Sequence, residues 1–198
     1  MEEQFAAIDG RPGLLLHSCC APCSSSVLER LEDRFSVSVF YYNPNIYPES
    51  EYRRRAEEQR LFLEKRGGIP LIETPFTPAD FEPLAKQYGD LPERGERCRA
   101  CYRLRIRKAA RYAAEHGFLW LCSTLSLSPH KNADWVNEEG EAAARDAGIN
   151  WLFSDFKKKD GFLRSLTLSA EYGLYRQEWC GCVFSYRARF GADFANEE

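Results

Sequence analysis

The sequence lacks the features of several protein classes. No apolar run approaches the roughly 20 residues that a membrane-spanning helix needs. Only 13 Gly and 10 Pro stand among 198 residues, beside 14% aromatic residues, and this composition excludes a collagen-like or disordered chain. The first residues are acidic and lack the basic-then-apolar order of a secretory signal peptide. We therefore expect a cytoplasmic protein without membrane contact, with a single domain over 1–198 and peripheral tails at 1–12 and 187–198.

An excess of charge of one sign is also missing, because 27 Lys and Arg stand against 30 Asp and Glu, a net charge of -3. This average hides a local basic run between Arg94 and Arg111, in which Glu96 is the only acidic residue. Such a run can attract phosphates even on an acidic protein. The plainer alternative is a solvated helix face, which a charge run more often is.

Cysteine is the abundant residue that needs an explanation. The eight cysteines fall into four places along the chain: Cys19-Cys20-x-x-Cys23, Cys98-x-x-Cys101, Cys122 and Cys180-x-Cys182. A disulfide framework is typical of small secreted domains and does not suit a cytoplasmic chain of this length. Metal binding or redox chemistry is the better interpretation. For Cys122 alone, the pattern indicates a small buried residue.

Short apolar or β-branched runs alternate with helical patterns along the chain. We predict strands at 14–17, 35–42, 69–74, 118–122 and 151–153, and helices after Ser24–Ser26 and at 49–66, 78–88, 98–116, 131–147 and 161–172. This alternation predicts an α/β fold with a mostly parallel, doubly wound (Rossmann-like) sheet and helices on both faces. Ligands of such sheets bind beyond the carboxyl ends of the strands, where Cys19-Cys20 follows the first strand. We expect the metal site there.

The cysteine spacing favours one kind of metal centre. Cys98-x-x-Cys101 opens a predicted helix, whose free N–H groups and dipole stabilise thiolates. Structural zinc sites usually pair two CxxC knuckles. Adjacent cysteines and a CxC fit an iron–sulfur cluster with a separate redox pair better. Cys180-Gly181-Cys182 either shuttles two electrons as a dithiol and a disulfide or ligates a metal, and the spacing leaves both open.

Aromatic and amide groups follow the second predicted strand. Residues 41–46, with Tyr52 and Arg55 beyond them, offer ring faces and amide edges that suit an unstacked base. An ordinary aromatic strand end is the alternative. Arg176, just before Cys180, places a cation beside the thiols. His17 precedes the cysteines on a buried strand and is expected to be a hydrogen-bonded core residue.

Five stretches together resemble the QueH family of epoxyqueuosine reductases, over about Leu14 to Ser185. They are HSCCAPC at 17–23, YNPNI at 42–46, RCxxCYxLR at 97–105, STLxxSPxKN at 123–132 and YRQxxCGC at 175–182. The resemblance implies reductive removal of the epoxide oxygen from epoxyqueuosine at the wobble position of a tRNA anticodon. It also implies a [4Fe–4S] cluster, no cobalamin and an electron donor that it does not identify.

The resemblance also assigns roles to residues. It implies Cys19, Cys20, Cys98 and Cys101 as cluster ligands and Cys180 and Cys182 as redox-active residues. A second iron, held by Cys180, Cys182 and Cys23, is left open. The substrate and tRNA contacts are expected among Tyr41, Asn43, Tyr52, Arg55, Tyr102, Arg103, Arg107, Ser123, Thr124, Ser128, Lys131, Arg176 and Gln177. Within that set, Arg103 and Arg107 are expected to grip phosphates, and Tyr41 or Tyr52 to stack on a flipped base.

Two other functions fit parts of the sequence. A zinc-stabilised RNA-binding module without catalysis would use the same cysteines and the same basic run. An ATP site in the strand–turn–helix at 14–31 is disfavoured, because Cys19, Cys20 and Pro22 stand where a phosphate-binding loop needs glycines.

Overall fold

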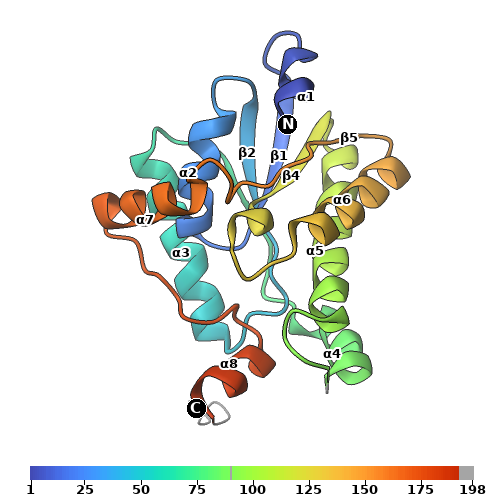
Figure 1. The fold of residues 1–198 in the computed structure, drawn as a ribbon, viewed down its shortest axis with the longest axis vertical. Helices are drawn as coiled ribbons and strands as arrows, with labels where there is room; N and C mark the ends of the chain where they lie inside the picture. The colour runs from blue at the N-terminus through green and yellow to red at the C-terminus, as the bar shows by residue number, and fades with distance from the viewer. Residues whose placement is uncertain (90, 192–198) are drawn as a thin grey trace.

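A computed structural model of the chain describes residues 1–89 and 91–191 (Figure 1). Its centre is one parallel sheet in the order β3-β2-β1-β4-β5. The strands are β1 (Gly13–Ser18), β2 (Ser36–Tyr41), β3 (Leu71–Glu73), β4 (Trp120–Ser123) and β5 (Asn150–Trp151). The order reverses between β1 and β4, and this switch point is where ligands bind in doubly wound sheets. The α/β, Rossmann-like prediction is confirmed.

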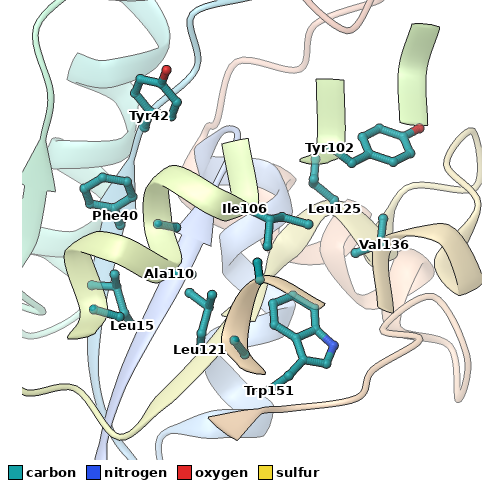
Figure 2. Close-up of a cluster of buried hydrophobic side chains, with 14 of the residues drawn as sticks. Leu15, Phe40, Tyr42, Tyr102, Ile106, Ala110, Leu121, Leu125, Val136 and Trp151 are labelled. Carbon is teal, nitrogen blue, oxygen red and sulfur yellow. The ribbon is translucent and has the colours of Figure 1, made fainter. Parts of the chain in front are cut away.

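Helices cover both faces of the sheet (Figure 1). α2 (Ala21–Leu31), α3 (Glu49–Lys65) and α7 (Gly161–Tyr172) lie on one side, and α5 (Glu96–Glu115) and α6 (Ala133–Ala147) lie on the other. β1 is apolar on both faces for this reason: Leu14 and Leu16 pack under α2, and Leu15 packs under α5. Figure 2 shows the hydrophobic cluster between the sheet and α5, in which Ile106 and Ala110 of the helix pack against Leu15 and Leu121 of the sheet.

The helix after β1 begins earlier than the sequence predicted. Its first residue is Ala21, with Cys20 as the N-cap and Pro22 in the first turn, rather than a residue after the serines at 24–26. Proline fits the first turn because the N–H it lacks has no partner within the helix there. This shift puts Cys23 in the first turn of α2. The cysteines of the first group therefore surround the positive end of this helix.

Other boundaries differ more modestly. The predicted helix at 78–88 is a short η1 (Pro78–Asp80) followed by α4 (Glu82–Tyr88), and the polar loop after β4 contains η2 (Thr124–Leu127). α8 (Val183–Phe190) was not predicted. It begins directly after the CxC with Cys182 as its N-cap, and it lies at the end of the molecule opposite α1 (Figure 1).

The N-terminal residues, expected to be a peripheral tail, pack against the edge of the sheet. α1 (Glu2–Ala6) places the ring of Phe5 edge-on to Phe35, with 6.1 Å between centroids. The Gln4 amide donates to the carbonyl of Trp151 on β5 and accepts from the N–H of Phe153. At the other end, residues 192–198 of the expected tail lie outside the described residues. Among the residues described, no helix has the length and apolarity to cross a bilayer.

Candidate metal centre

The first cysteine group lies at the carboxyl end of β1. Cys19 and Cys20 follow this strand, and their sulfurs and that of Cys23 all lie within 4.8 Å of one another. The sulfurs of Cys19 and Cys20 are 3.8 Å apart. Thr124 supports the group, because its Oγ1 accepts from the N–H of Cys19 and lies 3.6 Å from the Cys19 sulfur. Three sulfurs so placed are close enough together to hold one metal ion.

The second group joins the start of α5 to the loop before α8. Cys98 and Cys101 lie in the first turns of α5, and the N–H of Arg94 donates to the Cys98 sulfur. In the other segment, the Cys180 and Cys182 sulfurs are 3.4 Å apart. The Ser185 hydroxyl lies 3.0 Å from the Cys180 sulfur. All eight cysteines are free thiols.

Two cavities connect these groups. A cavity of about 520 Å³ is lined by Cys19, Cys20, Cys23 and Cys180, among other residues. A smaller one of about 50 Å³ is lined by Cys98, Cys101, Cys180 and Cys182. Cys180 and Arg105 line both cavities. The fold therefore gathers seven of the eight cysteines in one region, and leaves Cys122 buried apart from them beside Ser154.

Each group contains one thiol that ionises readily. Hydrogen bonds from Cys20 and Cys23 lower the pKa of Cys19 well below its usual value, whereas the pKa of Cys20 rises to about 11. In the same way, the hydrogen bond with Cys182 lowers the pKa of Cys180 and raises that of Cys182. A metal takes the place of the protons on such thiols, because thiolate is the ligand form.

The donor set and its surroundings fit a thiolate-bound metal group. Seven thiols exceed the four that one structural zinc ion takes. Two buried polar atoms beside the smaller cavity, Asn45 Oδ1 and Arg105 Nε, have no hydrogen-bond partner. Buried polar atoms normally have one, so these two point to an occupant that the protein itself does not supply.

The CxC loop is clamped by α3. The Arg55 guanidinium, only 2% exposed, donates to the carbonyls of Trp179 and Cys180 and forms a 2.6 Å ion pair with Glu51. Gly181 has φ +107°, and a Cβ there would lie 2.7 Å from Ile46 Cγ1. Only glycine fits both constraints, which explains its place between the two cysteines.

Two residues expected at the substrate, Asn43 and Ser123, form hydrogen bonds within the protein beside the cysteines. Asn43 donates to the carbonyl of Ser18 and accepts from Arg105. Ser123 binds Nδ1 of His17 at 2.8 Å. Burial lowers the pKa of His17 to about 3, so the ring is neutral, and its Nε2 donates to the carbonyl of Tyr42. His17 is thus a hydrogen-bonded core residue, as predicted.

The expectation that Tyr41 or Tyr52 stacks on a base is corrected. Tyr41 is 0% exposed and Tyr52 is 2% exposed. Their rings pack edge to face with centroids 5.1 Å apart, and both hydroxyls donate to backbone carbonyls. No ring face is left for a ligand. Arg55 anchors the CxC loop and also lines the larger cavity, so its contact with substrate stays a prediction.

The basic run on α5 is mostly paired within the protein. Arg103 pairs with Glu139 of α6 at 2.7 Å, and Arg99 pairs with Glu138 and Glu139. Arg97 is buried and donates to the carbonyls of Gly89 and Leu91. Arg107 lies 3.8 Å from Asp146. These contacts hold α5 against its neighbours, which weakens the expectation that Arg103 and Arg107 grip phosphates.

The remaining expected residues lie at the cavities. Ser128, Lys131, Arg176 and Gln177 line the larger cavity, and Tyr102, 4% exposed, lines the smaller one. Phe162 and Ser165 of α7 also line the larger cavity, and neither was predicted from the sequence. Their helical pattern resembled that of any amphipathic helix, so no local signal marked them.

The fold and these cavities define a class: a Rossmann-like α/β protein with a multi-thiol metal-binding region at the switch point of its sheet. The model of the family "Epoxyqueuosine reductase QueH" matches residues 14–188. Proteins named Epoxyqueuosine reductase QueH from Staphylococcus epidermidis and Thermotoga maritima are 42% and 33% identical to this chain. These matches cover 93% and 89% of the chain and 80% and 91% of the relatives. The chain therefore belongs to the QueH family and is an oxidoreductase.

Proposed function

We propose that this chain is a cytoplasmic epoxyqueuosine reductase that acts on tRNA, without cobalamin, and that Cys19, Cys20, Cys98 and Cys101 hold a [4Fe–4S] cluster. The observation that carries the proposal is the gathering of cysteines from three distant segments around the cavities at the switch point. When bound, the cluster transfers single electrons from an external reductant. The chemistry requires this external donor to be a one-electron carrier of low potential.

The CxC supplies the electron pair that opens the epoxide. The Cys180 thiolate and the Cys182 thiol are oxidised to a disulfide, which releases two electrons and one proton. Lys131 lines the smaller cavity together with both cysteines, and its ammonium gives the second proton. Both C–O bonds of the epoxide break, an alkene remains, and the oxygen leaves as water. Two single electrons from the external donor and two protons from solvent then restore the Cys180 thiolate, the Cys182 thiol and the Lys131 ammonium.

A second arrangement uses the same sulfurs differently. If Cys180, Cys182 and Cys23 held a further iron, they would supply a Lewis acid for the epoxide oxygen. The two arrangements differ in iron content and in whether the CxC cycles through a disulfide.

Unpaired cations surround the mouth of the larger cavity. Arg94 and Arg176 have no carboxylate within ion-pair distance among residues 1–89 and 91–191, and Lys131 has none either. Arg94 instead donates to His130 Nδ1 at 2.6 Å, and Arg176 donates to Ser169 Oγ at 3.0 Å.

Two acidic residues, Glu93 and Glu178, also line the larger cavity, and Glu178 lies 3.7 Å from Arg189. Free cations next to the thiols suit the phosphates that flank a wobble nucleotide. We infer that the anticodon loop binds here rather than on α5.

The double variant R94Q/R176Q tests this interface. We expect weaker binding of substrate tRNA and a salt dependence that is shallower by about 1.4, since each phosphate contact on single-stranded nucleic acid contributes about 0.7 to the slope. R99Q/R103Q removes the same charge from α5 and is the matched control, expected to keep the wild-type slope. The measurement is tRNA affinity at several salt concentrations. If R99Q/R103Q shows the shallower slope and R94Q/R176Q keeps the wild-type slope, the tRNA binds on α5.

Metal analysis of anaerobically purified protein tests the cluster. We expect iron and acid-labile sulfide at about four each per chain, and an iron excess if a second iron is bound. C98S/C101S should lose both, whereas C122S should keep them because Cys122 lies apart. Zinc without sulfide in the wild-type protein would contradict the proposed function and favour an RNA-binding module.

A further inference from the structure

Arg105 carries a buried positive charge that no carboxylate balances. It is 3% exposed, and its Nε has no hydrogen-bond partner. One terminal nitrogen donates to Asn43 Oδ1. Arg99, Arg103 and Arg107 of the same helix all face acidic residues. Within the described part of the chain, no acidic side chain lies within ion-pair distance of Arg105.

A buried guanidinium without a counter-charge is unfavourable, so an anion is expected next to it. Arg105 lines both cavities. Cys19 and Cys180 line the larger cavity beside it, and Cys101 and Cys180 line the smaller one. The sulfurs are therefore the source of negative charge that Arg105 faces.

Asn43 fixes the position of this charge relative to both cysteine groups. Its amide nitrogen donates to the carbonyl of Ser18, the residue before Cys19, and its oxygen accepts from Arg105 on α5. Asn43 is 0% exposed. The contact thus joins the end of β1, which carries the first cysteines, to the helix that carries Cys98 and Cys101.

We propose that Arg105, held by Asn43, is a positioning residue whose fixed charge raises the reduction potential of the metal–thiolate group bound by the surrounding cysteines. This inference rests on the proposed cluster. A thiolate-bound iron–sulfur group is anionic and gains one more negative charge with each electron. A cation held nearby stabilises the reduced form more than the oxidised form, and a low dielectric strengthens the effect.

The test is a redox titration of the loaded protein, followed by its visible and paramagnetic resonance spectra. In R105Q we expect the ratio of reduced to oxidised cluster at a fixed potential to fall at least tenfold, which is a shift of about 59 mV to more negative values. R105K keeps the charge and should stay within about threefold of wild type. R103Q removes an exposed charge that pairs with Glu139 and lines neither cavity, so it should titrate like wild type.

Two outcomes separate this inference from the proposed function. A wild-type protein that binds no cluster overturns both. A loaded R105Q that titrates like wild type overturns only the role of Arg105.

The metal-free protein gives a second readout. A charge that only tunes the metal group is not needed for folding, so the urea midpoint of metal-free R105Q should stay close to that of wild type. A metal-free R105Q that is clearly less stable, or that does not fold, would make Arg105 a structural residue and overturn the proposal.

Discussion

Replacing Cys180 by serine is expected to lower the formation of the alkene product by on the order of a thousandfold or more, the scale seen when a residue that acts in the chemical step is removed. A serine hydroxyl cannot form a disulfide, so the electron pair is lost. Cys180 is not among the four proposed cluster ligands, so iron and sulfide content should stay at the wild-type level. Product formation on epoxyqueuosine-containing tRNA measures the loss of turnover. Iron and sulfide content of the same samples shows whether the cluster is retained.

The control for this result is C122S. Cys122 is fully buried, with its sulfur 3.7 Å from Ser154 Oγ and away from the cavities. C122S should therefore retain turnover. Alkylation of thiols during turnover should trap a disulfide in the wild-type protein and none in C180S. If C180S instead loses iron, Cys180 is a ligand, and the arrangement with a second iron replaces the redox pair.

Much of this fold could be predicted from the sequence because its signals are local. Leu14–Leu16 form a continuous apolar run, which only a strand buried on both faces needs. The prediction that Cys19 and Cys20 follow the carboxyl end of that strand was therefore correct. The start of α2 was missed because three serines resemble helix caps more than Cys20 does, although Pro22 marks a first turn.

The parts that could not be predicted depend on partners far along the chain. Glu139 is 36 residues from Arg103, so the basic run showed no sign that α6 neutralises it. Tyr41 and Tyr52 carry polar groups typical of binding sites, yet backbone carbonyls satisfy both hydroxyls. Arg105 differs from Arg103 and Arg107 in being buried and in lining the cysteine cavities, and nothing in the local sequence marks that difference.

Arg55→Met should lower the free energy of unfolding by about 3–5 kcal/mol, the cost of leaving one partner of a buried ion pair unpaired. The side chains of Arg55 and Glu51 are 2% and 8% exposed. The same variant removes the donors that hold the carbonyls of Trp179 and Cys180. Urea unfolding of the metal-free, reduced protein measures the change without a contribution from cluster loss.

The same helix supplies the matched control. Arg53 and Glu49 form an ion pair with the same spacing and the same 2.6 Å separation, but their side chains are 75% and 47% exposed. Arg53→Met should cost at most about 1 kcal/mol, because water screens an exposed pair. E51Q/R55M removes both buried charges and should recover part of the stability lost in R55M. Burial is what distinguishes the Arg55–Glu51 ion pair from the Arg53–Glu49 pair, and Arg55 also ties α3 to the CxC loop. Equal stability of R53M and R55M would therefore contradict the proposed stabilising role of Arg55.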